Sequence, residues 1–500
     1  MAQGSLGDRM SAQDASFLYF EKEEAPLHIG SIGVFDGDVS YDKFVANVAA
    51  KMHLIPRYMQ RAVFAPFNIG HPSWEWDPDF DITRHIMTAE IQAPGNHEQL
   101  LDLAAGLFQE KLDRNKPLWE MYLVRGLEGD RTALISKVHH CLVDGVSGIE
   151  LLMIVLDVSA DPPPTQSVQT EEKPPVPGPV RLFANAALDT MSQRLDRILD
   201  QQSTFVDWLT TGADRTRSIG RAIENSRPYL NVPVVRAPFN QPLRRDRKLA
   251  VSEFSFAEIR AIRQAVGGTV NDVCLAVLGG AVGRYLEMHQ QTTEGRSFRI
   301  LTPVNVRRED EKGALGNRVS MLLVEVPVGI RDPIERLKII NARTTSLKER
   351  NVADGINIFA EMSADVPPMI QGFMGNLPTP PNTLANMVCT NVPGPMIPLF
   401  TVGHRLVAHY PMVPLGWEMG VGCGVTSYNQ KLYFGLMADA AAAPDVNRLK
   451  EFLDQAYVEL RSAAGVAKSD IPQMGVAVET SDRPRRATGQ HADSMAADAG

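Results

Sequence analysis

The sequence predicts an α/β protein with two lobes built on mixed sheets, joined by a proline-rich and helical crossover. The chain has 500 residues, whereas a single hydrophobic core stops growing at roughly 250–300 residues, so two lobes are expected. The run ADPPPTQSVQTEEKPPVPGPV interrupts the chain, and the parts on either side mix strand and helix patterns. We expect an N-terminal lobe at 1–157, the crossover at 158–237, a C-terminal lobe at 238–465 and a disordered tail at 466–500.

The elements of each lobe follow from the spacing of apolar residues. In the N-terminal lobe, HIGSIGVF, LWEMYLV and TALISKVHH are predicted strands, and YDKFVANVAAKM and EQLLDLAAGLFQEKL are predicted helices. In the C-terminal lobe we expect a helix at 271–286, with Asn271 as its N-cap and Asp272 in its first turn. The strands RILTPVNV and MLLVEVPV follow it. Between the lobes, apolar residues at helical spacing predict a helix within 181–225.

Charge and cysteine content exclude several classes of protein. The net charge is −9 and the sequence pI is about 5.7, so no nucleic-acid partner is expected. The four cysteines form no CxxC pair, which argues against disulfides and a zinc site and favours a reducing compartment. No metal is expected. The N-terminus lacks the apolar region of a secretory signal, and no apolar run reaches the ~20 residues of a membrane span. We expect a cytoplasmic protein.

Two segments are candidates for peripheral membrane contact. A helix at 181–209 has the pattern of an interfacial helix, and the basic run RRDRK at 244–248 suits anionic head groups. The acidic net charge favours the alternative, in which the helix packs on the protein and the basic run is a solvated face.

The segment HHCLVDG carries the residues best suited to catalysis. If TALISKVHH is a strand, His139 and His140 at its end point to opposite faces, so one is the working base of a cleft and the other is held structurally. Asp144 and Gly145 lie in the tight turn from this strand to an apolar helix. The ordinary pKa of imidazole lies near neutrality, which suits a general base for a hydroxyl nucleophile. The alternative is a pair of strand-end histidines hydrogen-bonded to the backbone.

HHCLVDG matches the HHxxxDG motif of the chloramphenicol-acetyltransferase-like superfamily of CoA-dependent acyltransferases. Further segments resemble one branch of that superfamily, the bacterial wax ester synthase/diacylglycerol acyltransferase family. These segments are MSAQDASFLYFE near the start, KPLWEMYLVRGL with Pro117, Leu118 and Trp119, GGTVNDVCLAVLGGAVGRYL with Asn271 and Asp272, and then LTPVNVR, GNRVSMLLVEVPV and TNVPGP. They follow the family's order across roughly residues 10–465.

The resemblance implies two chloramphenicol-acetyltransferase-like lobes with the active channel between them. It also implies an acyl-CoA-dependent O-acyltransferase that converts diacylglycerol to triacylglycerol or a long-chain alcohol to a wax ester, without an acyl-enzyme. Acyl-CoA is then a co-substrate and no cofactor is expected. His140 would be the general base and His139 would orient it. Because both acceptors are lipids, the implied partner surface is the inner face of the plasma membrane or a lipid droplet.

Two further pairs of residues receive roles from the resemblance. Asp144 would form a structural ion pair with an arginine of the other lobe, for which Arg307 at the end of LTPVNVR is the candidate and Arg318 the rival. Asn271 and Asp272 are candidates for contact with substrate. Helix capping alone accounts for both of these residue types, and that interpretation is favoured.

Other residues have plainer interpretations. Trp119 begins an apolar strand, so PLW is expected to be structural, and NVPGP is a turn. Cys141 occupies a position that HHxxxDG leaves unspecified and is expected to pack. Ser147 lies in DGVSGIE, which is not the GxSxG of a serine hydrolase.

Two rival functions share these observations. Plant-type acyltransferases and peptide-synthetase condensation domains also carry HHxxxDG, but the plant-type DFGWG is absent and the nearest string is PLGWEMG at 414–420. No carrier domain follows in this chain. A catalytically idle lipid-binding or scaffold protein is the rival of another class, and the intact HHCLVDG disfavours it.

Overall fold

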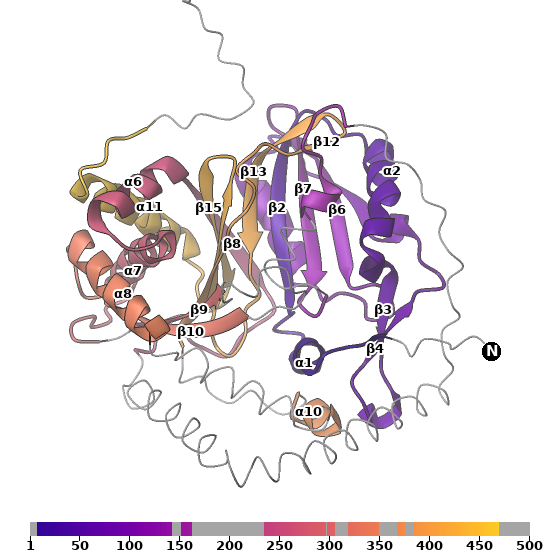
Figure 1. Ribbon diagram of the computed structural model, residues 1–500, viewed down its shortest axis with the longest axis horizontal. Coiled ribbons are helices and arrows are strands. Elements are labelled where there is room, and N and C mark those ends of the chain that lie inside the picture. The colour runs from indigo at the N-terminus through magenta and orange to yellow at the C-terminus, as the bar shows by residue number, and fades with distance from the viewer. Residues whose placement is uncertain are drawn as a thin grey trace, which may run out of the picture.

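The computed structural model describes residues 8–142, 152–162, 235–296, 298–305, 319–349, 368–375 and 385–469. In these ranges two six-stranded sheets and one three-stranded sheet form the frame. Figure 1 shows the two large sheets next to each other in the middle of the molecule, with helices on the outer sides. The predicted fold class, mixed α/β, is confirmed.

The first large sheet has the strand order β12-β13-β2-β7-β6-β5. Its strands are β2 (His28–Asp36), β5 (Ile86–Glu90), β6 (Trp119–Leu127), β7 (Arg131–His139), β12 (Phe400–Thr401) and β13 (His404–Met412). β5 pairs with β6 in parallel and the other neighbours are antiparallel, so the sheet is mixed. β12 and β13 come from the C-terminal part of the chain and bind it to the N-terminal sheet.

Two helices belong to this first sheet, α2 (Tyr41–Lys51) and α3 (His97–Phe108). The start of α3 is fixed by a capping box, in which the Asn96 side chain accepts from the N–H of Gln99 and the Gln99 side chain accepts from the N–H of Asn96. The helix packs closely on the sheet because Gly30 of β2 has no side chain. A Cβ there would lie 2.1 Å from the Phe108 ring.

The second large sheet has the order β10-β9-β11-β14-β15-β8. Its strands are β8 (Arg247–Ser255), β9 (Phe298–Asn305), β10 (Val319–Val326), β11 (Met387–Val392), β14 (Val421–Tyr428) and β15 (Lys431–Asp439). β11 runs parallel to β9 and to β14, and the remaining pairs are antiparallel. This sheet is therefore mixed as well.

The helices α6 (Phe256–Val266), α7 (Val270–Met288), α8 (Pro333–Glu349) and α11 (Val446–Ala463) cover the second sheet. Figure 1 shows them on the side that faces away from the first sheet. α7 is apolar on nearly all sides and is the buried helix of this core. The two large sheets pack on each other, and β15 approaches β13 so closely that a Cβ on Gly435 would meet the Pro411 carbonyl oxygen at 1.8 Å.

A small sheet, β1-β4-β3, lies beside the N-terminal helix. It contains β1 (Asp8–Arg9), β3 (Gln60–Val63) and β4 (Ser73–Trp76), and the helix is α1 (Ala12–Phe20). Short 3-10 turns occupy Met52–Leu54 (η1), Pro56–Met59 (η2), Pro66–Asn68 (η3) and Ile82–Arg84 (η4), and α10 (Pro368–Gly375) contacts α1. A separate small core joins α1 to the residues that follow β7, including Leu18 and Cys141.

The predicted crossover at 158–237 lies mostly outside the described residues, as do the helix predicted within 181–225 and most of the tail at 466–500. Among the described helices, none is by itself long and apolar enough to cross a membrane. The pair α6 and α7, bent by 97°, reaches that length and composition only together.

The basic run RRDRK contacts the N-terminal lobe, and the prediction that this run is a solvated face is wrong for Arg247. This side chain is buried and donates to the Glu24 carbonyl oxygen of the N-terminal lobe at 2.6 Å. Arg245 forms an ion pair with Glu110 beyond the end of α3. For Arg247, the Glu24 carbonyl oxygen thus takes the place of solvent, whereas Arg245 and Glu110 stay half exposed.

Candidate active site

The histidine pair lies where β7 ends, between two strands that hold its backbone. The N–H of His139 donates to the Leu118 carbonyl oxygen at 3.0 Å, and the N–H of His140 donates to the Leu27 carbonyl oxygen at 2.9 Å. Leu118 belongs to PLW at the start of β6, and Leu27 immediately precedes β2. Both neighbours therefore fix the direction in which the two imidazoles leave the sheet.

His139 is buried, and its surroundings select one tautomer. The backbone N–H of Cys141 donates to its Nδ1 at 3.2 Å, so in the neutral ring the proton is on Nε2. Nε2 faces Oε1 of Glu21 at 3.4 Å, and both side chains are 1% exposed. This is the geometry of an orienting histidine, and the role remains a prediction.

Glu21 is the carboxylate that sequence reasoning did not single out. It follows α1, and it accepts from the Leu27 N–H at 3.1 Å and from the Arg114 guanidinium at 2.9 Å. Burial acts to raise the pKa of this carboxyl, but hydrogen bonds to and charges on His139 and Arg114 outweigh burial and lower the pKa to about 2. The carboxylate is therefore ionised at neutral pH. The only sequence signal for it was its place at the end of MSAQDASFLYFE.

His140 is partly exposed and takes a different neighbour. Its ring stacks on Phe17 of α1, with ring centroids 4.1 Å apart and an angle of 11° between the planes. Phe17 and Glu21 are four residues apart, and the Glu21 N–H donates to the Phe17 carbonyl oxygen at 3.1 Å. One turn at the end of α1 thus contacts both histidines.

Further ionisable groups are buried behind His139. His28 lies directly opposite it in the β2–β7 ladder, and burial lowers the pKa of His28 to about 3. Burial also lowers the pKa of Lys137, whose Nζ lies 3.3 Å from the Glu120 carboxylate and donates to the Glu110 carbonyl oxygen at 2.9 Å. His28 is buried inside the sheet, and both its burial and its lowered pKa favour a structural role.

The Asn-Asp pair begins α7, but the predicted N-cap is wrong. Thr269 is the N-cap, in a capping box with Asp272, and Asn271 lies inside the helix, where its Oδ1 is 3.5 Å from Nδ2 of Asn391. Asp272 is buried, and its oxygens accept from Thr269, from Nδ2 of Asn341 at 3.0 Å and from the hydroxyl of Thr344 at 2.8 Å. These contacts give Asp272 a structural account. Substrate contact by Asn271 or Asp272 remains a prediction.

The PLW segment is buried throughout, as expected of core residues. The Trp119 indole donates to the Tyr58 carbonyl oxygen at 2.8 Å and stacks on His85, with ring centroids 4.6 Å apart. Leu118 and Pro117 are covered beside it. PLW therefore packs the sheet and, through the Leu118 carbonyl oxygen, holds His139.

Three predicted residues, Asp144, Gly145 and Arg307, lie outside the described residues, together with the rival Arg318 and with Ser147. The ion pair between Asp144 and an arginine therefore stays a prediction.

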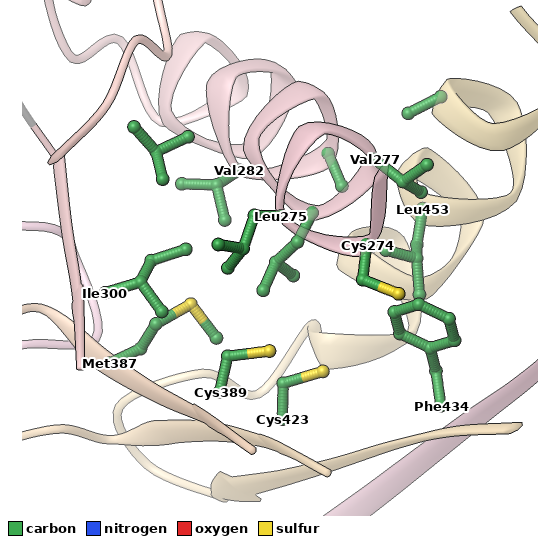
Figure 2. Close-up of a cluster of buried hydrophobic side chains, with 14 of the residues drawn as sticks. Cys274, Leu275, Val277, Val282, Ile300, Met387, Cys389, Cys423, Phe434 and Leu453 are labelled. Carbon is green, nitrogen blue, oxygen red and sulfur yellow. The ribbon is translucent and has the colours of Figure 1, made fainter. Parts of the chain in front are cut away.

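The cysteines that are described are buried and free. Cys141 packs in the small core beside α1, and burial raises its pKa well above the usual range. Figure 2 shows Cys274 of α7 in the layer above Cys389 and Cys423, which are partners in the β11–β14 ladder. Buried thiols pack as small hydrophobic side chains. The burial of Cys141 in the small core beside α1 confirms the prediction that this residue packs. Within the described ranges no cluster of metal-ligating side chains occurs.

Comparisons with known proteins agree with this geometry. The family model "Wax ester synthase/diacylglycerol acyltransferase catalytic domain" matches residues 10–274, and the model "WS/DGAT C-terminal domain" matches residues 315–461. A Mycobacterium tuberculosis protein named "probable diacylglycerol O-acyltransferase tgs1" is 28% identical over 91% of this chain and 96% of its own length.

Solved structures agree as well. A wax ester synthase/diacylglycerol acyltransferase from Marinobacter aquaeolei is 25% identical, with a TM-score of 0.62 over 92% of this chain and 100% of that one. The first condensation domain of the calcium-dependent antibiotic synthetase has a TM-score of 0.58 over 92% of this chain and 96% of that one. At 13% identity, the second likeness concerns the fold alone.

The two packed sheets and the histidine pair at the end of a central strand define an acyltransferase of the two-lobed α/β class. Within that class, the chain belongs to the wax ester synthase/diacylglycerol acyltransferase family. The family predicted from the sequence motifs is confirmed.

Proposed function

We propose that this protein transfers an acyl group from acyl-CoA to the hydroxyl of diacylglycerol, giving triacylglycerol, and to long-chain alcohols, giving wax esters. The observation that carries the proposal is the histidine pair of HHCLVDG, with one imidazole buried and the other partly exposed, in a chain that two models of this family match in order. Acyl-CoA is the co-substrate, and the proposal includes no cofactor and no metal.

The chemistry assigns the proton to His140. Its imidazole accepts the hydroxyl proton while the acceptor oxygen attacks the thioester carbonyl carbon, because a free hydroxyl has a pKa far above neutrality and needs a base within reach. The tetrahedral intermediate then expels the CoA thiolate, which receives the proton from the imidazolium. The ester C–O bond forms, the C–S bond breaks, and no covalent acyl-enzyme occurs.

The neighbours of His140 support this assignment. The Phe17 ring covers one face of the imidazole at a centroid distance of 4.1 Å, which limits ring rotation. An aromatic face also favours the imidazolium that forms during the reaction, by on the order of 1 kcal/mol. His139 cannot take the role in its place, because it is buried, its Nδ1 is hydrogen-bonded and its Nε2 faces Glu21.

We also propose that the protein contacts a lipid surface, because both acceptors are lipids. Support comes from apolar side chains on α10 and the adjoining η3, where Phe373 is 66% exposed and Phe67 is 81% exposed. Met369 and Ile370 are exposed on the same short helix. This surface adjoins α1, which carries Phe17. We therefore place a cytoplasmic enzyme on the inner membrane face or a lipid droplet with α10 towards the lipid.

Flotation with phosphatidylcholine vesicles that contain dioleoylglycerol tests this contact. The double variant Phe67→Ser/Phe373→Ser should float less than the wild type. Val458→Ser is the matched control, because Val458 is an exposed apolar residue on α11, away from this surface. Equal flotation of the double variant and the control would refute contact through α10 and η3.

Product analysis tests the reaction itself. Purified protein receives palmitoyl-CoA with dioleoylglycerol or with hexadecanol, CoA release is followed, and the lipid product is identified by mass spectrometry. Triacylglycerol from the first acceptor, or wax ester from the second, supports the proposal, and the ratio of rates gives the preferred acceptor. A folded protein that binds palmitoyl-CoA and releases no CoA with either acceptor would support the lipid-binding rival. Chelators should leave the rate unchanged.

A further inference from the structure

The residue that connects α1 to the histidine pair is Glu21. Its Oε1 faces two donors, the Leu27 N–H at 3.1 Å and Nε2 of His139 at 3.4 Å. The carbonyl oxygen of the same Leu27 accepts the His140 N–H at 2.9 Å. One carboxylate oxygen therefore contacts the ring of one histidine and also Leu27, the residue whose carbonyl oxygen accepts from the backbone of the other.

The other oxygen of Glu21 anchors the carboxylate. Nη2 of Arg114 donates to Oε2 at 2.9 Å and to the Leu18 carbonyl oxygen of α1 at 2.8 Å. The arginine is thus bound both to the helix and to the carboxylate. Since Glu21 is buried, its charge needs these partners to remain in the protein interior.

The direction of the contacts explains what Glu21 does to His139. The Cys141 N–H occupies Nδ1, so the Nε2 proton points at Oε1 of Glu21. The distance of 3.4 Å between Nε2 and Oε1 is long for a hydrogen bond, so the contact orients the ring electrostatically. A carboxylate in this position holds the tautomer and the plane of the ring, as carboxylate–imidazole pairs do in other active sites.

We infer that Glu21 is a positioning residue for the acyl transfer. It orients His139 beside the general base His140, and the donors from Leu27 and Arg114 hold the carboxylate in place for this contact. The inference rests on the proposed function. Because the proposal gives Glu21 no contact with the substrate or with the proton that His140 accepts, its loss should lower kcat and leave KM for acyl-CoA nearly unchanged.

Glu21→Gln is the variant that tests the inference, because glutamine keeps the length but offers one acceptor oxygen to three donors. We expect kcat for CoA release to fall about 10- to 100-fold, the range that follows from a catalytic group displaced by a fraction of an ångström. Glu23→Gln is the matched control, since Glu23 lies two residues further on and pairs at the surface with Lys111. It should keep the wild-type kcat.

A double-mutant cycle with His139→Ala separates positioning from general damage. If Glu21 acts through His139, the substitution Glu21→Gln should change kcat less than about threefold in the His139→Ala background. The same loss in both backgrounds would overturn the inference, and so would a Glu21→Gln enzyme within about twofold of the wild type. A wild type that does not turn over at all would instead refute the proposed function.

One measurement on the wild type keeps the inference testable if Glu21→Gln does not fold. Nitrogen-15 NMR of histidine-labelled protein, assigned with His139→Ala, reports the tautomer of His139. The proton should be on Nε2. A proton on Nδ1 would place no donor in front of Glu21 and would overturn the inference.

Discussion

Replacing Asp272 by alanine separates a structural role of the Asn-Asp pair from a role in substrate binding. The carboxylate is buried at the start of α7 and serves donors from Thr269, Asn341 and Thr344. The Thr344 hydroxyl keeps a second acceptor, the Asn341 carbonyl oxygen at 3.1 Å. The N–H and the hydroxyl of Thr269 and the Asn341 amide lose theirs, but Thr269 is exposed and water can serve its two donors.

The magnitude follows from the partly buried Asn341 amide and from the loss of the capping box at the start of α7. A donor left without its acceptor costs about 1–3 kcal/mol and a lost cap about 0.5–2 kcal/mol, so the variant should lose about 1.5–5 kcal/mol of unfolding free energy. Urea unfolding followed by far-UV circular dichroism measures the loss. Asn271→Ala is the matched control. Its amide oxygen meets Nδ2 of Asn391 at the long distance of 3.5 Å, so its loss should be under about 1 kcal/mol.

The kinetics of the folded fraction complete this test. Asp272→Ala should keep the wild-type KM for palmitoyl-CoA and for diacylglycerol, because the carboxylate points into the protein. An Asp272→Ala enzyme with the wild-type urea midpoint and a KM raised by about tenfold, equivalent to ~1.4 kcal/mol of lost binding, would refute the structural account. Asp272 would then be a substrate-binding residue.

Three further predictions follow from the described contacts. The pKa of Glu21 is lowered from an ordinary 4.5 to about 2, so its ionisation stabilises the fold by on the order of 3 kcal/mol above about pH 5, and this contribution disappears as the pH falls towards 2. The difference in melting temperature between wild type and Glu21→Gln should therefore shrink on acidification. A difference that stays constant with pH would contradict this prediction. Phe17→Leu removes the ring stacked on His140 and should lower kcat about tenfold with little change in the melting temperature; an unchanged kcat would show that the stacking is unimportant. Gly435→Ala places a methyl group against the Pro411 carbonyl oxygen between the sheets and should cost about 1–3 kcal/mol in urea unfolding, which an unchanged midpoint would contradict.

Local sequence patterns predicted the elements around the histidine pair. Strand alternation in TALISKVHH predicts that His139 and His140 point to opposite faces, and this stays a prediction because β7 ends at His139. The two rings do have different neighbours, Glu21 and Phe17. The start of α7 was missed by two residues, although Thr269 and Asp272 have the spacing of a capping box. The strand alternation and the capping box are both local signals in the sequence, and the capping box was overlooked.

Long-range pairings were beyond the reach of the sequence. Strands β12 and β13 of the C-terminal part join the N-terminal sheet, with β13 next to β2, and no local pattern states which sheet a strand enters. The burial of Arg247 against Glu24 has the same cause, because a basic run does not reveal its partners. Glu21 contacts His139 from a helix more than a hundred residues earlier, so only the tertiary fold brings them together.

The rate of CoA release by His140→Ala tests the central claim most directly. Wild type and variant receive palmitoyl-CoA with dioleoylglycerol, and circular dichroism confirms that both are folded. His53→Ala is the control, because His53 is an exposed histidine on η1. If His140 is the general base, its variant should lose about 10²–10⁴ in kcat while the control keeps the wild-type rate. Equal rates in His140→Ala and wild type would mean that another group accepts the hydroxyl proton.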